Sequence, residues 1–166
     1  MEMKLLRGQI CLIDEIDFET YSQQSWGIVD GYVARGSFAE KTTYYLHLEI
    51  ARRIWTTEQM KGLLVDHKDQ NKLNNQRSNL RLATHSENQA NRGLHPKNRS
   101  GFKGVSWNKN ARKWAASIQF QGKRIYLGLY LTKEQAAVAY NLAASKYFGE
   151  FAQLNILPEI TEGRRN

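Results

Sequence analysis

The sequence predicts an α+β protein made of two units, each with a small antiparallel sheet and a helix. Residues 63–92 have the pattern of a strand, an Asn-rich loop, a second strand and a helix. Residues 101–155 have the pattern of a three-stranded antiparallel sheet packed on one long helix. Residues 96–100, which are polar or Pro, predict a linker between the two patterns. We therefore predict a first domain at residues 1–95, a second at 101–155 and a tail at 156–166.

Residues 1–60 are expected to form a small lead-in to the first unit. Residues 10–13 are a short apolar run, and the stretch 14–17 that follows, with three acidic residues, predicts a turn. The run Trp26–Arg35 predicts a β-hairpin, because Asp30-Gly31 is a turn signal between β-branched and aromatic residues. Residues 42–45 are expected to continue that sheet.

A helix that ends near Trp55 is predicted after this sheet. One face of it is marked at i, i+3, i+4 and i+7 by His47, Ile50, Ala51 and Ile54. We interpret His47 first as a residue that packs or hydrogen-bonds on that face and not as a metal ligand, and its role in a site is left open.

The segment 63–92 concentrates side chains suited to metal-dependent chemistry. Asp66 and His67 end its first strand, and Asn88 lies on the helix predicted at residues 86–92. Carboxylate and amide oxygens are hard donors that suit Mg²⁺, and an imidazole titrates near neutral pH. Neighbours on an extended strand point to opposite faces, so either Asp66 and His67 lie where the strand ends or twists and serve one phosphate, or one of the two roles is misassigned.

The start of that helix is also predicted. Thr84-His85-Ser86-Glu87 matches a capping box, in which the Thr hydroxyl and the Glu carboxylate satisfy N–H groups of the first turn. The cap sets where the helix begins and therefore where Asn88 points.

This segment resembles the HNH nuclease motif, in particular the homing-endonuclease branch of the ββα-metal superfamily. The matching residues are Asp66, His67, Asn74, Asn75, Asn79, Leu80, Arg81, Ser86, Glu87 and Asn88. The separation between the acid and the last Asn, 88 − 66 = 22, fits that branch.

The resemblance implies a DNA endonuclease with catalytic residues at His67 and Asn79. His67 would be the general base, and Asn79 would hold the loop between the strands so that the imidazole is aimed correctly. Asp66 and Asn88 would hold one Mg²⁺ or Mn²⁺ in each active site. Arg81 is either a phosphate contact or a solvated strand residue.

The second unit begins after the predicted linker. Strands are predicted at residues 102–107, 113–120 and 124–129, with Gln121-Gly122 as the second turn. A capping box that opens at Thr132 starts the helix. Its packed face is predicted to contain Ala136, Ala137, Tyr140, Ala143, Ala144 and Tyr147, with Gly149 as the stop.

Alternation of side chains divides the residues of this sheet between two faces. The face expected to meet the helix contains Trp114, Ala116, Ile118, Phe120, Ile125 and Leu127. The opposite face contains Ala115, Ser117, Gln119, Arg124 and Tyr126. Because no remaining part of this small unit can cover the opposite face, we expect it to be exposed.

The second unit resembles the APETALA2/ethylene-response-factor DNA-binding domain. The matching segments are Gly104-Val105, Trp114-Ala115-Ala116, 123–128, 136–140 and 152–155. That family lays a three-stranded sheet in the major groove of double-stranded DNA. Carried over by position, the DNA-binding residues are Lys103, Ser106, Ser117, Gln119, Arg124 and Tyr126. Several positions that are Arg, Trp or Glu in the plant factors differ here, so their target sequence is not carried over.

The net charge of +8 supports a nucleic-acid partner. Residues 1–60 hold six Lys or Arg against nine Asp or Glu, whereas residues 61–100 hold eight against three and residues 101–155 eight against two. A polyphosphate backbone favours such an asymmetry through counterion release.

Composition excludes several other classes. Cys11 is the only cysteine, so neither a disulfide framework within one chain nor a Cys-rich structural zinc site is possible. No apolar run approaches the ~18 residues of a membrane span, and the N-terminus lacks the apolar core of a signal peptide. We expect an intracellular protein, in the cytoplasm of a bacterial host or encoded by a phage, that is not secreted, contacts no membrane and needs no small-molecule cofactor.

Two alternative functions are left open. A non-catalytic DNA-binding regulator would keep the nuclease fold as a second DNA-binding unit, although the intact set of motif residues argues against it. An RNA-directed nuclease is disfavoured, because the second unit resembles a reader of double-stranded DNA. We expect a monomer or a weak dimer, and a monomer with one active site is expected to nick a single strand.

Overall fold

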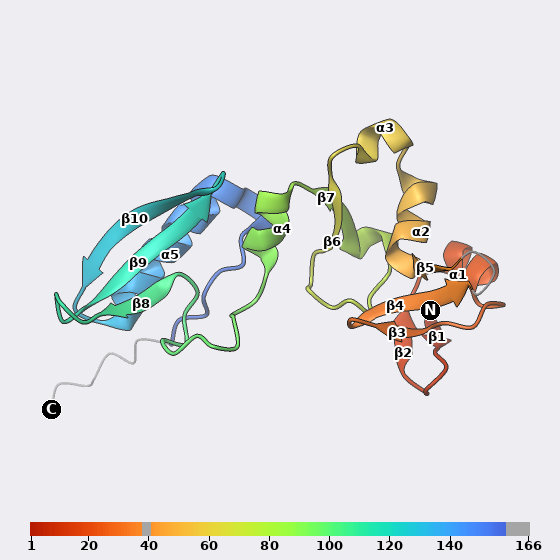
Figure 1. Cartoon of the computed structure of the whole chain (residues 1–166), viewed down its shortest axis with the longest axis horizontal. Helices are drawn as coiled ribbons and strands as arrows, with labels where there is room; N and C mark the ends of the chain where they lie inside the picture. Colours follow the sequence, from red (N-terminus) through yellow and green to blue (C-terminus); the bar gives the residue numbers. More distant parts are fainter. Residues whose placement is uncertain (38–40, 159–166) are drawn as a thin grey trace, which may run out of the picture. The chain divides into compact units, whose positions relative to one another are not determined.

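The computed structural model describes residues 1–37 and 41–158 and confirms the α+β fold (Figure 1). The chain divides into two compact units, Met1–Asn88 and Gln89–Asn166. The division lies earlier than residues 96–100, where the sequence pattern places the linker. The physical reason is that Ala90 is buried in the hydrophobic core of the second unit. The predicted tail lies outside the described residues from 159 onward.

The first unit is built from short strands and helices (Figure 1). In chain order they are β1 (Glu2–Lys4), β2 (Ile10–Leu12), α1 (Glu15–Tyr21), β3 (Gly27–Val29), β4 (Tyr32–Ser37), β5 (Thr42–Tyr45), α2 (Leu46–Ile54), α3 (Thr57–Met60), β6 (Leu64–His67), η1 (Arg77–Asn79), β7 (Leu80–Ala83) and α4 (His85–Asn91). Helix α4 continues into the second unit. Among the described residues of this unit, three antiparallel sheets contain the strands, in the orders β1-β2, β3-β4-β5 and β6-β7.

Most of the predicted elements are confirmed in this unit. The hairpin turns at Asp30 and Gly31, whose φ angles of 51° and 80° are those of a turn that matches the twist of the strands. The acidic stretch 14–17 was wrongly predicted as a turn, because it starts α1. Glu15 and Asp17 lie in the first turn of that helix, where negative charge interacts favourably with the free N–H groups.

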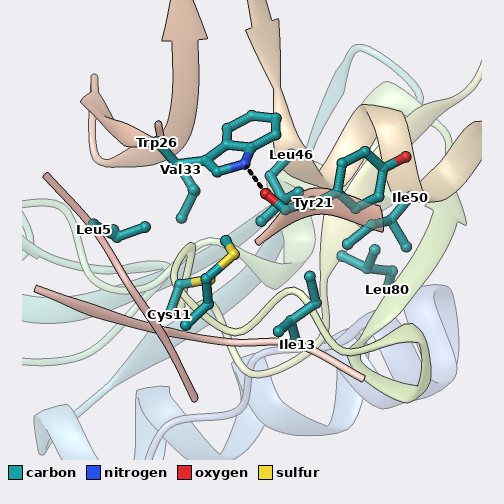
Figure 2. Packing of buried hydrophobic residues seen from close by; sticks show 10 residues of the cluster. Leu5, Cys11, Ile13, Tyr21, Trp26, Val33, Leu46, Ile50 and Leu80 are labelled. Atoms are coloured by element: carbon teal, nitrogen blue, oxygen red, sulfur yellow. Dashed lines mark hydrogen bonds between the residues drawn. The ribbon is translucent and has the colours of Figure 1, made fainter. Parts of the chain in front are cut away.

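A single hydrophobic core joins the lead-in to the β6–β7 hairpin (Figure 2). Its buried residues are Met3, Leu5, Cys11, Ile13, Tyr21, Trp26, Val33, Leu46, Ile50 and Leu80. The Trp26 ring meets the edge of the Tyr21 ring at 5.9 Å, and its Nε1 donates to the Tyr21 carbonyl at 2.9 Å. Because Leu80 belongs to β7, the lead-in packs against the hairpin that carries Asp66 and His67.

The loop between β6 and β7 is also tied to the lead-in by polar contacts. Asp17 is fully buried and accepts two hydrogen bonds from the Arg77 guanidinium, at 2.7 and 2.8 Å. Leu12 donates its N–H to the Leu73 carbonyl and accepts from Asn75, both at 2.8 Å. These bonds attach the loop to α1 and to β2.

The second unit contains the predicted three-stranded sheet and helix. Its elements are β8 (Val105–Asn108), β9 (Lys113–Phe120), β10 (Lys123–Tyr130), α5 (Lys133–Phe148) and η2 (Gly149–Phe151). The sheet is antiparallel with the order β10-β9-β8. Strand β8 begins three residues later than predicted, at Val105, because Ser100 holds a turn there, with its hydroxyl bonded to the Phe102 and Val105 carbonyls.

The packed faces of this sheet and helix are confirmed. Small residues of α5 let it lie close to the sheet, and its buried residues are Ala136, Ala137, Tyr140, Ala143, Ala144 and Phe148. Phe148 takes the buried place that was predicted for Tyr147, which packs only partly against the core. Strand β10 has a bulge at Leu127, since Tyr126 pairs with Ser117 and Gly128 with Ala116.

Within the part of the chain that the structure describes, no helix is both long and apolar enough to cross a bilayer.

Candidate active site and nucleic-acid interface

The β6–β7 hairpin places an ion pair beside the predicted base. Asp66 and Arg81 face each other across the strands, and Arg81 Nε donates to Asp66 Oδ2 at 2.9 Å. Both side chains are buried, at 6% and 8% exposed, so Arg81 is not a solvated strand residue. The register pairs His67 with Leu80, so Asp66 and His67 lie on opposite faces of the hairpin at the end of β6.

His67 is a buried imidazole that is held on several sides. It is 5% exposed, and its Nε2 lies 3.3 Å from Asn75 Oδ1. The ring centroids of Tyr32 and His47 are 6.1 and 5.2 Å from its own. Burial lowers the pKa of His67 below its ordinary value and outweighs the opposing effect of Asn75 and the nearby carboxylates. At neutral pH the ring is therefore uncharged and can accept a proton.

Asn79 forms hydrogen bonds across the loop that follows His67. Its Nδ2 donates to Asp69 Oδ1 at 2.9 Å and to the Asn74 carbonyl at 2.7 Å, and its Oδ1 accepts from the Asp69 N–H at 3.1 Å. The Asn79 carbonyl accepts from the N–H of Lys68 at 2.9 Å. Burial opposes ionisation of Asp69, but its hydrogen bonds outweigh this effect and lower its pKa. A charged carboxylate thus holds the loop together.

Tyr32 of the lead-in and His47 lie beside the His67 ring, and the sequence motif did not include either of them. Tyr32 of β4 stacks on the His47 ring at 5.0 Å, and Tyr45 lies at 5.9 Å from it. Lys72 Nζ lies 3.9 Å from the centre of the Tyr32 ring. Helical periodicity placed His47 on the packed face, which is confirmed by its 7% exposure. No comparable signal pointed to Tyr32.

His47 is buried without a full set of hydrogen bonds. Its Nδ1 has no hydrogen-bond partner among the described residues. Burial, together with the positive charge that His67 and Lys72 can carry, lowers the pKa of His47 from 6.5 to about 3. The ring therefore stays uncharged in the folded protein over the physiological range.

This pKa shift predicts that the first unit loses stability in acid. Because the pKa of His47 is lower in the folded than in the unfolded chain, the unfolded chain binds the proton first as the pH falls below 6.5. We expect His47 to reduce the free energy of unfolding by about 2 kcal/mol between pH 7 and pH 4.5. Urea denaturation of the wild type and of His47→Phe at several pH values measures the effect. Parallel stability curves for the two proteins would contradict it.

Helix α4 carries the second predicted metal ligand. Its capping box is confirmed, since Thr84 N–H donates to Glu87 Oε2 at 2.8 Å and Glu87 N–H donates to Thr84 Oγ1 at 3.2 Å. Asn88 follows in the first turn and is half-buried. Residues 1–37 and 41–158 contain no group of three or more His, Cys, Asp or Glu side chains that could hold a metal ion. A set of one carboxylate and one amide oxygen still fits Mg²⁺ in chemical character, because this ion keeps several water ligands.

The exposed face of the second unit brings together most of the predicted DNA-binding residues. The register pairs Gln119 with Arg124 and Ser117 with Tyr126, and Ser106 lies on the same face opposite Ala115. Arg124 Nε donates to Ser117 Oγ at 3.0 Å. Tyr126 is 62% exposed. This face thus presents a cation, an aromatic ring and several hydrogen-bonding groups.

Lys103, which was also predicted to bind DNA, makes its contacts with helix α4 and not with the exposed sheet face. Its ammonium group donates to the backbone carbonyls of Ala90 and Arg92, both at 2.5 Å, and to that of Gln89 at 3.4 Å. Burial and the neighbouring Arg92 lower the pKa of Lys103 to about 8. Lys103 therefore caps the C-terminal end of α4, where cations are favourable.

A β-hairpin with an acid and a His on its first strand is thus followed by a helix that carries an Asn, the order of elements expected for the class of ββα nuclease motifs. Comparison with known proteins agrees with this class: residues 52–90 match the HNH endonuclease family. The chain is 43% identical over 93 residues to the uncharacterized HNH endonuclease L560 of Acanthamoeba polyphaga mimivirus, which covers 56% of this chain and 47% of that protein.

Other relatives match shorter parts of the chain. Protein 3.8 of Escherichia phage T7 is 42% identical over 64 residues, which cover 39% of this chain and 53% of that protein. In the C-terminal region, the ethylene-responsive transcription factor ERF024 of Arabidopsis thaliana is 42% identical over 67 residues, or 39% of this chain and 34% of that protein. The chain spans about half the length of the two viral relatives. No solved structure matches it. Both predicted resemblances are therefore confirmed.

Proposed function

We propose that this protein is a metal-dependent DNA endonuclease of the HNH type that acts on double-stranded DNA inside cells. The observation that supports the proposal most strongly is the buried, uncharged His67 at the end of β6. It lies in the hairpin of the segment that matches the HNH endonuclease family. A base of this kind accepts a proton from the attacking water at neutral pH.

The other motif residues have distinct roles in this proposal. Asp66 and Asn88 would hold Mg²⁺ or Mn²⁺, which when bound acts as a Lewis acid on the phosphate and the leaving oxygen. Asn79 is a positioning residue, since its bonds to Asp69 and Asn74 hold the loop that follows His67. Arg81 is held by Asp66 at the edge of the site, where a guanidinium can contact the phosphate.

The second unit would select and hold the DNA. Its exposed sheet face carries the proposed contacts Ser106, Ser117, Gln119, Arg124 and Tyr126. Lys103 was predicted to belong to this set, but its ammonium group is engaged by backbone carbonyls. Because the two units are tethered in one chain, weak binding by each combines into useful affinity.

Replacing Arg124 on the sheet face is expected to weaken DNA binding. Arg124→Ala should lower affinity by about five- to hundredfold, or about 1–3 kcal/mol, and reduce the salt slope by about one if it contacts a phosphate. Binding titrations at several salt concentrations measure both effects. Lys146→Ala is the matched control, because Lys146 is an exposed cation on α5, on the other side of the sheet. An equal loss in both variants would show that only net charge matters.

Cleavage of supercoiled plasmid tests the proposed activity. The protein is incubated with Mg²⁺, with Mn²⁺ or with EDTA, and binding to the same DNA is measured in parallel. Metal-dependent formation of open circles is the expected result, because a monomer with one site nicks one strand. Direct conversion to linear DNA would refute nicking by a monomer. Binding without cleavage on any DNA, including DNA from the native genomic neighbourhood, would favour the non-catalytic regulator.

A further inference from the structure

We propose that Asn75 is a positioning residue that selects the tautomer of His67, with the proton on Nε2 and the lone pair on Nδ1. Nδ1 is then the nitrogen that takes the proton from water. The inference rests on the proposed nuclease function for its catalytic consequence. Its structural content, the tautomer itself, can be measured without any cleavage.

The direction of the Asn75 amide follows from its other contacts. Asn75 is fully buried, and its Nδ2 donates to the Lys72 carbonyl at 3.4 Å. Asn75 also lies beside the buried thiol of Cys11, where burial raises the pKa of the thiol to about 11 and Asn75 opposes this effect. Its backbone N–H donates to the Leu12 carbonyl at 2.8 Å, which fixes the main chain at this point. The amide nitrogen is thus committed to one side, so the oxygen faces His67.

The atom of Asn75 that faces His67 determines which of the two ring nitrogens carries the proton. An amide oxygen is only an acceptor, so the contact of 3.3 Å between Asn75 Oδ1 and His67 Nε2 is a hydrogen bond only if Nε2 donates. A neutral imidazole carries one proton, and Nδ1 is therefore the basic nitrogen. The opposite tautomer would place two lone pairs against each other in a buried site.

The residues around His67 and Asn75 hold both side chains in place, so that Asn75 can select one tautomer. The Tyr32 and His47 rings lie at 6.1 and 5.2 Å from the His67 ring and restrict its rotation. Asn75 itself is attached to β2 through Leu12, and the core of the first unit includes Cys11 beside it. The orientation of the base is thus set by the lead-in, through a residue eight positions after His67.

Nitrogen NMR on the whole chain tests the inference directly. Long-range ¹H–¹⁵N spectra of the metal-free protein at about pH 7.5, where an ordinary imidazole is neutral, distinguish the protonated from the unprotonated ring nitrogen. We expect His67 to show a single tautomer with Nε2 protonated. A wild-type spectrum with Nδ1 protonated, or with two tautomers averaged, would overturn the proposal without any variant.

Variants then assign the effect to Asn75. Asn75→Ala removes the acceptor and is expected to mix the tautomers and to lower the single-turnover cleavage rate about three- to tenfold, with DNA affinity retained. Asn75→Asp keeps an acceptor oxygen and should restore the single tautomer. Asn71→Ala is the control, because Asn71 is an exposed Asn of the same loop. An unchanged spectrum in folded Asn75→Ala would refute the role of Asn75.

The two proposals fail in different ways. A protein that never cleaves DNA but shows the expected tautomer contradicts the nuclease function and leaves the role of Asn75 in place. A protein that cleaves DNA while its His67 has the other tautomer contradicts only the role of Asn75.

Discussion

Replacing His67 by Gln is expected to slow plasmid cleavage by about 10²–10⁴-fold, the usual contribution of a general base. Gln cannot accept the proton from water, whereas its amide can still donate toward Asn75 Oδ1 and fill much of the space of the ring. Because His67 is buried and uncharged, it contributes little attraction to phosphate. DNA affinity should therefore stay within about twofold of the wild type, which separates chemistry from binding.

The control for this variant is His95→Gln. His95 is exposed and lies in the second unit, outside the proposed site. Cleavage by this control should match the wild type. Loss of cleavage in both variants would point to a general effect of removing an imidazole, and full activity of His67→Gln would refute its role as the base.

Replacing Gly104 by Ala is expected to destabilise the second unit by about 2–4 kcal/mol. Gly104 has a φ of +74°, a conformation that side chains with a Cβ rarely adopt. A Cβ at this position would lie 2.0 Å from Cδ2 of Tyr140 and 2.6 Å from the Ser117 carbonyl oxygen. Tyr140 is buried in the core, so it cannot move aside without opening a cavity.

Gly122→Ala is the control that measures the cost of the positive φ alone, without the steric overlap that a Cβ at Gly104 has with Tyr140. Gly122 has a φ of +77°, but a Cβ there would meet nothing within 4 Å. It should therefore cost only about 1 kcal/mol. Amide hydrogen exchange in β9 of the full chain reports the stability of the second unit by itself. Equal losses for the two variants would contradict the overlap between Gly104 and Tyr140.

The sequence by itself determined the elements whose physics is local. Asp30-Gly31 supplied the φ angles of a hairpin turn, and the capping boxes at Thr84 and Thr132 fixed where two helices begin. Alternation along β9 separated the packed from the exposed face of the second sheet, because successive side chains of a strand point to opposite sides. The spacing of the motif residues was sufficient to recognise the nuclease segment.

Tertiary structure alone decided what each polar group of the site contacts. Arg81 proved to be buried against Asp66, and Lys103 proved to cap α4, although both types of residue are usually solvated. The tautomer inferred for His67 depends on an amide whose direction is set from β2 and from Lys72. Propensity and periodicity describe neighbours along the chain, whereas these partners are chosen by which distant groups the packed core brings together. For that reason the sequence predicted where the site is, and only the fold determined how its groups are held.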